Sequence, residues 1–261
     1  MSKNGIPVTE SPSSFQVLRR IKASAIFDWL HAGVTDTHRG GWASLFYGVV
    51  FAATGLLIHA VFADNYWLLA GLTTGFLLLG PFLAMGLYDL SRRMELGEAP
   101  KFVPSLTAWR PNLTNIGLFA GLLVLVLLIW TRASLVIFAY FFDGGLPTFT
   151  DVALNVITFK QPIFTLIYFA VGGLFATSIF AISVIAMPLM MDRKTSAATA
   201  AMASLLACGR NPVPMLLWAL CITVIIGFGF ATSFLGLIVA MPVVGHASWH
   251  VYRDLVEEIK P

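Results

Sequence analysis

Residues 113–142 read LTNIGLFAGLLVLVLLIWTRASLVIFAYFF, an almost uninterrupted apolar run in which Arg132 is the one charged residue. A helix needs about 20 mainly apolar residues to cross the roughly 30 Å hydrocarbon core of a bilayer. Backbone N–H and C=O groups find no water there, so such a run must be helical. The segment therefore predicts an all-α membrane protein.

Comparable apolar segments recur along the chain and predict six transmembrane helices. We expect them over residues 43–63, 66–88, 113–142, 162–191, 213–231 and 233–250. The last two divide residues 213–250, a stretch too long for one crossing, at a turn around Thr232 and Ser233. The composition agrees, because 11% of the 261 residues are charged against about 25% in soluble domains. We predict a mobile polar tail over residues 1–10 and one transmembrane domain over residues 11–261.

The basic residues predict the orientation of the chain. Lys160 and Arg132 are the basic residues on one side of the predicted membrane. The other side carries Lys3, Arg19, Arg20, Lys22, Arg39, Arg92, Arg93, Lys101, Arg110, Arg193, Lys194, Arg210, Arg253 and Lys260. Lys and Arg accumulate on the cytoplasmic side of membrane proteins. We therefore expect both termini in the cytoplasm.

Two cytoplasmic segments are predicted to form amphipathic helices that lie in the membrane interface. The first covers about residues 12–35, where apolar residues at helical spacing oppose Arg19, Arg20 and Lys22. The second covers about residues 195–209, where Met202, Leu205 and Leu206 fall on one side of an alanine-rich helix. These helices would lie along the bilayer surface beside the spans.

The order of the motifs predicts an internal repeat of three helical hairpins. Each unit has an arginine before an ascending span, a proline within the descending span, and an acidic residue at its inner end. The arginines are Arg39, Arg110 and Arg210, the prolines are Pro81, Pro188 and Pro242, and the acidic residues are Asp89, Asp192 and Asp254. A carboxylate is unfavourable at a helix C-terminus because of the helix dipole. We therefore expect at least two of the acidic residues to contact one of the three arginines.

His246 and His250 are the candidate metal ligands, because side chains four residues apart share one face of a helix. They fall at the inner end of the last predicted span, where histidine also serves as an interfacial anchor. No third histidine within a span is expected at that depth, although His31 and His38 are on the same side. We predict no metal, no cofactor and no catalytic residues. A net charge of +3 is too small to indicate nucleic acid as a partner.

Three segments resemble an uncharacterised bacterial family of integral membrane proteins, a domain-of-unknown-function family. They are residues 42–48 (WASLFYG), 80–93 (GPFLAMGLYDLSRR) and 245–255 (GHASWHVYRDL). Members are sometimes loosely labelled cytochrome c oxidase subunit I. The chain lacks the set of span-embedded haem and copper histidines that such a subunit needs, so the resemblance implies a bacterial inner membrane but no oxidase activity.

These observations favour a non-catalytic accessory, assembly or scaffolding component whose partners are the lipid bilayer and other membrane protein subunits. One alternative is a transporter or channel for a small solute, suggested by the repeated proline-kinked spans. However, no acidic residue is expected near the middle of a span, where proton-coupled carriers use one. A haem- or metal-binding redox protein is the second alternative, suggested by the histidine pair.

Overall fold

The computed structural model describes residues 19–62, 80, 83–142 and 149–256, and within these ranges the regular structure is helical, with no strand. The helices in the first half are α1 (Ala25–Gly40), α2 (Trp42–Phe62), an unlabelled helix over residues 83–95, α4 (Phe102–Ser105), the 3-10 turn η1 (Arg110–Asn112) and α5 (Leu113–Phe141). The helices in the second half are α6 (Phe149–Thr158), α7 (Pro162–Ser183), α8 (Ala186–Arg193), α9 (Ala197–Arg210), α10 (Pro212–Ala231) and α11 (Leu237–Leu255).

Four helical stretches in the described ranges are long and apolar enough to cross a membrane. They cover Trp42–Ala60, Phe102–Phe141, Pro162–Arg193 and Pro212–Ala231, and correspond to the predicted spans 43–63, 113–142, 162–191 and 213–231. The predicted class, an all-helical membrane protein, is thereby confirmed. The chain has the apolar helices of a multi-pass protein, which places it in the lipid bilayer.

Two of the six predicted spans are not among these four. Most of span 66–88 lies outside the described residues, and residues 83–88 are the start of a helix that continues to residue 95. Span 233–250 corresponds to a series of turns followed by α11. The second half of α11 carries two histidines, an arginine and an aspartate and is largely buried by protein, so it does not have the composition of a lipid-facing helix.

The predicted interfacial helices fall in different surroundings. The tail over residues 1–10 and the start of the first helix lie outside the described residues; residues 19–22 are not helical, and α1 covers Ala25–Gly40. The second predicted interfacial helix, residues 195–209, corresponds to α9. This helix begins after Ser196, whose hydroxyl accepts a hydrogen bond from the backbone amide of Thr199. Ser196 is therefore an N-cap that satisfies a free amide of the first turn. The alanine face of α9 packs inward, whereas Met202, Leu205 and Leu206 are exposed.

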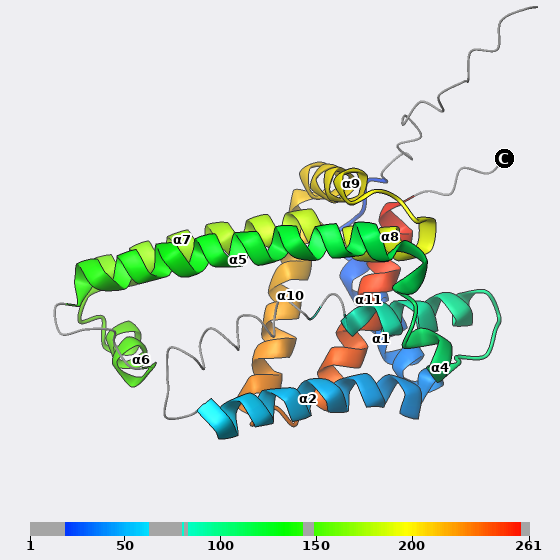
Figure 1. The fold of residues 1–261 in the computed structure, drawn as a ribbon, viewed down its shortest axis with the longest axis horizontal. Coiled ribbons are helices and arrows are strands. Elements are labelled where there is room, and N and C mark those ends of the chain that lie inside the picture. Colours follow the sequence, from blue (N-terminus) through cyan, green and yellow to red (C-terminus); the bar gives the residue numbers. More distant parts are fainter. Residues whose placement is uncertain (1–18, 63–79, 81–82, 143–148, 257–261) are drawn as a thin grey trace, which may run out of the picture.

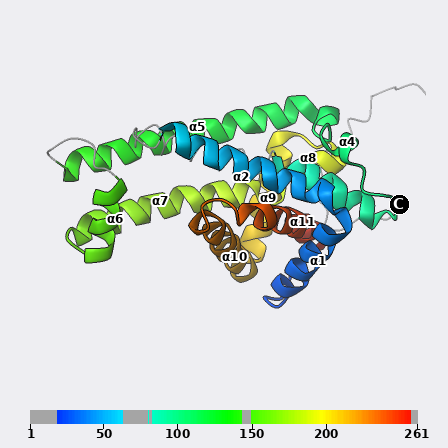
Figure 2. The same ribbon diagram turned by 90° about the horizontal axis from the view of Figure 1, so that it is seen from below.

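Helices α2, α5 and α7 run along the long axis of the molecule, and α10 runs across them (Figure 1). The beginnings of α2 and α5 and the end of α7 lie at the same end of the molecule, together with α4 and α8 (Figures 1 and 2). The α5–α7 hairpin extends away from this end, with α6 at its far tip (Figure 1). The molecule therefore has a packed end and a long projecting hairpin.

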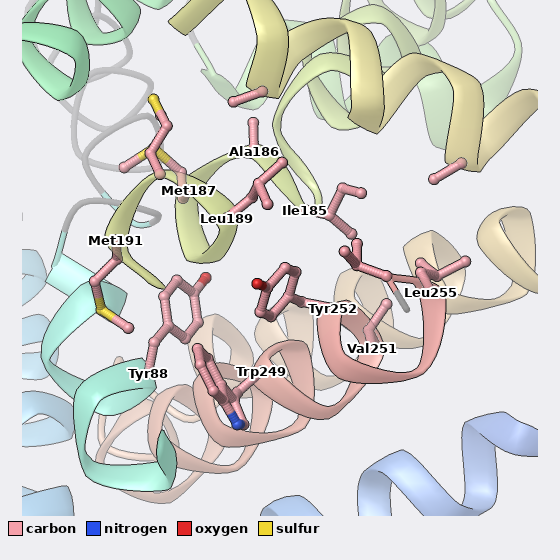
Figure 3. Packing of buried hydrophobic residues seen from close by; sticks show 14 of the residues in the cluster. Tyr88, Ile185, Ala186, Met187, Leu189, Met191, Trp249, Val251, Tyr252 and Leu255 are labelled. Atoms are coloured by element: carbon pink, nitrogen blue, oxygen red, sulfur yellow. The ribbon is translucent and has the colours of Figure 1, made fainter. Parts of the chain in front are cut away.

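The hydrophobic core lies at the packed end, where three helix segments converge. They are the helix over residues 83–95, α8 and the C-terminal half of α11, which contribute Tyr88, Met187, Leu189, Trp249 and Tyr252 (Figure 3). Pro188 shapes this region, because a proline clashes with the carbonyl four residues earlier. Helix α7 accordingly ends next to Val184, and α8 starts as a separate helix at Ala186. All residues from Ala186 to Met191 are buried.

Helix α11 packs closely against α1 and α2 because glycines face it at both crossings. A Cβ atom on Gly48 of α2 would overlap the backbone carbonyl of Ile238, and one on Gly33 of α1 would overlap Val243 and Ala247. Pro242, within α11, lacks the N–H that would otherwise bond to the Ile238 carbonyl. The Gly48 backbone therefore covers the acceptor that this proline leaves free. Pro81, the third predicted proline, lies outside the described residues.

Candidate functional site

The candidate site is the C-terminal half of α11, residues 245–255, which we call the α11 hub. Its polar side chains point to several other helices rather than to solvent alone. The side chains that bond to residues elsewhere in the chain include His246, Trp249, His250, Tyr252, Arg253 and Asp254. The hub is also the segment whose sequence, GHASWHVYRDL, carries the densest set of polar and aromatic residues of any predicted span end.

His246 is at the centre of a buried hydrogen-bonded chain. Its Nε2 lies 2.8 Å from the hydroxyl of Ser44 on α2, and its Nδ1 lies 2.7 Å from the hydroxyl of Ser91 on the helix over residues 83–95. Ser91 also bonds to Asp36 of α1 at 2.7 Å, and His250 Nε2 lies 2.8 Å from the same carboxylate oxygen. His246 and Ser44 have no exposed surface. The chain therefore connects four helices inside the packed end.

The donors and acceptors in this chain follow from the chemistry of its members. An ionised Asp36 can only accept, so Ser91 gives its single hydrogen to the carboxylate and must accept from Nδ1–H of His246. In neutral His246 the other nitrogen, Nε2, then accepts from the Ser44 hydroxyl. Each buried polar atom thus has a partner, and His246 is held in one tautomer. A fully satisfied network of this kind fixes one arrangement of the helices around it.

Asp36 is the acidic group of the network. Burial alone would raise the pKa of its carboxyl, but opposing effects outweigh burial, and the largest of these are the hydrogen bonds from His250 and Ser91. The pKa of Asp36 therefore lies below its ordinary value, which keeps the carboxylate ionised and accepting hydrogen bonds at neutral pH. His250 is the partly exposed end of the chain, with 28% of its side chain accessible.

The structure places the histidine pair on one face of α11, as the spacing predicts, but gives the two rings different partners. Within the described part of the chain, no three His, Cys, Asp or Glu side chains lie close enough together to hold a metal ion. His31 and His38, the other histidines expected on this side, are exposed on α1. The contacts seen for His246 are with hydroxyl groups, so its arrangement is that of a helix-to-helix connection.

Other residues of the α11 hub contact the C-terminal ends of the other two core segments. Trp249 donates to Glu95 at 3.0 Å, and Arg253 pairs with the same carboxylate at 2.8 Å. Tyr252 donates to Asp192, which follows α8's buried residues, at 2.7 Å and accepts from Arg193. Burial, with the nearby charge of Asp192, raises the pKa of Tyr252, so its hydroxyl stays protonated and remains a donor.

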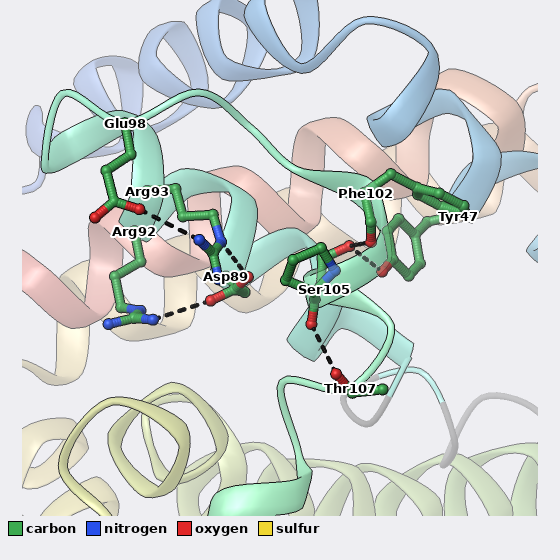
Figure 4. Close-up of polar contacts among 9 residues, drawn as sticks. Tyr47, Asp89, Arg92, Arg93, Glu98, Phe102, Ser105 and Thr107 are labelled. Carbon is green, nitrogen blue, oxygen red and sulfur yellow. Dashed lines mark hydrogen bonds and ion pairs between the residues drawn. The ribbon is translucent and has the colours of Figure 1, made fainter.

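The three acidic residues of the predicted repeat all have partners, but not the predicted ones. Asp89 is buried and pairs with Arg93 at 2.7 Å and Arg92 at 3.1 Å (Figure 4). Asp192 bonds to Tyr252, and Asp254 accepts from Trp29 of α1 at 2.6 Å.

The predicted contacts to Arg39, Arg110 and Arg210 are therefore wrong for these acidic residues. Arg92 and Arg93 follow Asp89 by three and four residues on the same helix, a spacing at which side chains meet without any tertiary contact. Arg39 and Arg210 are exposed, and Arg110 lies over the ring of Trp109 instead. The carboxylate of Asp89 is compensated by arginines of its own helix. Asp192 is compensated by Tyr252 of the α11 hub, and Asp254 by Trp29 of α1.

Two asparagines that the sequence analysis did not select occupy matching places. Asn112 precedes α5, and its amide donates to the carbonyls of Met190 and Thr195 at 3.0 and 2.9 Å. Asn211 precedes α10, and its amide donates to the carbonyls of Arg19 and Ala207 at 3.0 and 3.2 Å. Both asparagines are buried. The signal in the sequence is their common position, since Asn112 lies two residues after Arg110 and Asn211 directly follows Arg210.

The comparison with known families concerns the segment between the second predicted span and α8. Residues 68–192 match the family described as Predicted integral membrane protein (DUF2189). The match confirms the resemblance to an uncharacterised membrane family. The matched segment includes Ser91 and Asp192, which contact the α11 hub, whereas the hub itself lies beyond the matched segment. No curated protein and no solved structure matches the chain.

Proposed function

We propose that this protein is a non-catalytic accessory, assembly or scaffolding component of the bacterial inner membrane. It binds the transmembrane helices of other membrane proteins through its α5–α7 hairpin and holds that hairpin in place through the packed end. The observation that carries the proposal is the long apolar hairpin projecting from a small core whose polar groups are connected to one another.

The hairpin buries little of its apolar surface within the protein. In the most apolar part of each of its two long helical stretches, 11% of the residues are buried. The two helices contact each other through aromatic side chains, such as Trp130 against Phe175 and Phe138 against Tyr168. Their outer faces carry exposed leucine, isoleucine and valine residues. Such faces need lipid or a protein partner to cover them.

Glycines on the hairpin favour a protein partner for part of this surface. A Cβ atom added at Gly121 of α5 or at Gly173 of α7 would meet no atom within 4 Å. Small residues on a helix surface let a second helix approach closely in a membrane, where packing rather than hydrophobicity drives helix association. Gly172, by contrast, is covered by the ring of Trp130.

Affinity purification from native membranes tests this function. We expect a co-purifying membrane protein in stoichiometric amount with the parent protein, and at least tenfold less of it with Gly121→Leu or Gly173→Leu. The added side chains would hold a partner helix away, although a Cβ atom at either position meets no atom within 4 Å in the protein itself.

Gly209→Leu, at an exposed and open position on α9 rather than on the hairpin itself, is the matched control and should keep the partner. Equal recovery of the partner with all three variants would contradict a role for the hairpin. A haem absorbance band in the parent protein, without any partner, would instead favour the redox alternative.

We also propose the six-span topology with three hairpin repeats and both termini in the cytoplasm. The convergence of residues 83–95, α8 and the α11 hub supports it, because these are the inner ends of the three predicted descending spans. The corresponding positions of Asn112 and Asn211 before α5 and α10 also support it. The site residues of the proposal are the repeat positions Arg39, Arg110, Arg210, Asp89, Asp192, Asp254, Pro81, Pro188 and Pro242.

Reporter fusions test the topology directly. Fusions at residues 5, 97, 195 and 258 should report the cytoplasm, and fusions at residues 64 and 150 the periplasm, because the basic residues accumulate on one side. A periplasmic reading at residue 258 would mean that residues 213–250 cross the membrane once. The six-span topology would then be wrong.

A further inference from the structure

An apolar cavity of about 390 Å³ opens at the surface between α2, the helix over residues 83–95, α4 and the start of α5. Its lining includes Tyr47, Met85, Leu106, Trp109, Leu113 and Gly117. We propose that this cavity binds one acyl chain of an anionic phospholipid, whose phosphate is held by Arg110 at the rim. This lipid site does not depend on the existence of a protein partner.

The lining has the chemistry of an acyl-chain site. The exposed leucines Leu106 and Leu113 form part of the lining, so the cavity is reached from the surface. The two hydroxyls in the lining are engaged with each other, because Tyr47 and Ser105 form a hydrogen bond of 2.7 Å (Figure 4). A hydrocarbon chain can fill such a space without leaving a polar group unpaired, whereas a polar ligand would find few free groups.

The cavity volume fits a hydrocarbon chain better than a whole lipid. Small-molecule pockets have volumes of about 300–1,000 Å³, so this cavity can enclose a chain segment but not two chains and a headgroup. The rest of the lipid must then remain outside, with its headgroup near the rim. The proposal therefore depends on what lies at that rim.

The rim lies where the chain passes from charged to apolar sequence. Arg110 is exposed and begins η1, the turn that leads directly into the long apolar helix α5. Its guanidinium lies 5.8 Å from the ring centre of Trp109, which itself lines the cavity. Tryptophan and arginine at the end of a span are typical of the headgroup region of a bilayer. A lipid whose chain enters the cavity would have its phosphate at this depth.

The charge at the rim favours an anionic headgroup. In the described part of the chain, Arg110 forms no ion pair with a carboxylate, and Lys101 is exposed at the other end of α4. Arginine binds phosphate oxygens through paired N–H donors. A basic residue beside a span contributes about 1 kcal/mol to the binding of anionic lipids. This free energy corresponds to an increase in affinity of about five-fold.

Lipid titration of the purified protein in detergent tests the proposal, with phosphatidylglycerol and phosphatidylcholine as the two probes. Native mass spectrometry gives the bound fraction, and thermal unfolding gives the stabilisation. The parent protein should retain one phosphatidylglycerol with at least five-fold preference over phosphatidylcholine. Arg110→Gln should lower the affinity for phosphatidylglycerol about five-fold and leave that for phosphatidylcholine unchanged.

Two matched pairs of variants separate the chain site from general effects. Gly117→Leu places a side chain into the cavity and should abolish the bound lipid, whereas Gly121→Leu, one turn further along α5 and outside the lining, should not. Arg210→Gln, at the exposed arginine before α10, is the control for Arg110→Gln and should bind as the parent does.

The outcomes decide between the possibilities. Equal binding of the two lipids by the parent protein, or retention of the lipid by Gly117→Leu, would overturn the proposal. If Gly117→Leu fails to fold, Arg110→Gln still tests the proposal, because this substitution replaces an exposed side chain. An unchanged affinity of Arg110→Gln for phosphatidylglycerol would refute the contact between Arg110 and the phosphate. A variant that loses the protein partner but still binds the lipid would affect the hairpin interface and not the lipid site.

Discussion

Replacing Gly48 with alanine is expected to destabilise the protein by about 2–3 kcal/mol, the upper part of the range of about 1–3 kcal/mol found when a well-packed core is overfilled. The added Cβ would overlap the backbone carbonyl of Ile238. Backbone cannot move aside as a flexible side chain does, so α2 and α11 must separate. That separation would also lengthen the contact between Ser44 and His246, four residues earlier on α2. The measurement is the thermal unfolding midpoint in detergent.

Gly121→Ala is the matched control for Gly48→Ala. Both glycines are within long apolar helices, but a Cβ at Gly121 meets nothing within 4 Å. Because alanine is favoured over glycine inside a helix by about 0.5–1 kcal/mol, this variant should be as stable as the parent or more stable. If the two variants lower the midpoint equally, the close crossing of α2 and α11 does not contribute to stability.

The helical membrane fold could be predicted because it depends on local composition. The four spans found in the described ranges correspond to apolar runs, and a run of about 20 such residues has few alternatives to a membrane helix. For α11 the sequence was ambiguous. Its first half is apolar, but residues 245–255 alternate polar and aromatic residues, and nothing in that order says whether lipid or protein surrounds them.

The candidate site could be predicted only in part, for a related reason. The four-residue spacing of His246 and His250 identifies a shared face without any tertiary information. Their partners Asp36, Ser44 and Ser91 come from three other helices, and no spacing rule connects positions 55 to 214 residues apart. The repeat arginines were assigned to the wrong acidic residues because distant partners were preferred to Arg92 and Arg93, which lie within one turn of Asp89.

His246→Ala is expected to destabilise the protein by about 2–4 kcal/mol, since two effects add. The Ser44 hydroxyl would lose its acceptor in a site that water does not reach, which costs about 1–3 kcal/mol. The fully buried imidazole would also leave a cavity among α1, α2 and α11, with a further loss of packing. Thermal unfolding in detergent again gives the effect, and protease sensitivity of the α1–α2 connection reports whether the helices loosen.

His250→Ala distinguishes the buried end of the network from its exposed end. His250 keeps 28% of its side chain accessible, so water can replace its bond to Asp36, which also retains the bond from Ser91. We expect a loss of about 1 kcal/mol or less, as for other exposed pairs. Equal and small effects of both substitutions would show that the network does not hold the helices together. Stoichiometric metal that disappears in both variants would make the pair a ligand set, contrary to the connecting role derived from its hydroxyl partners.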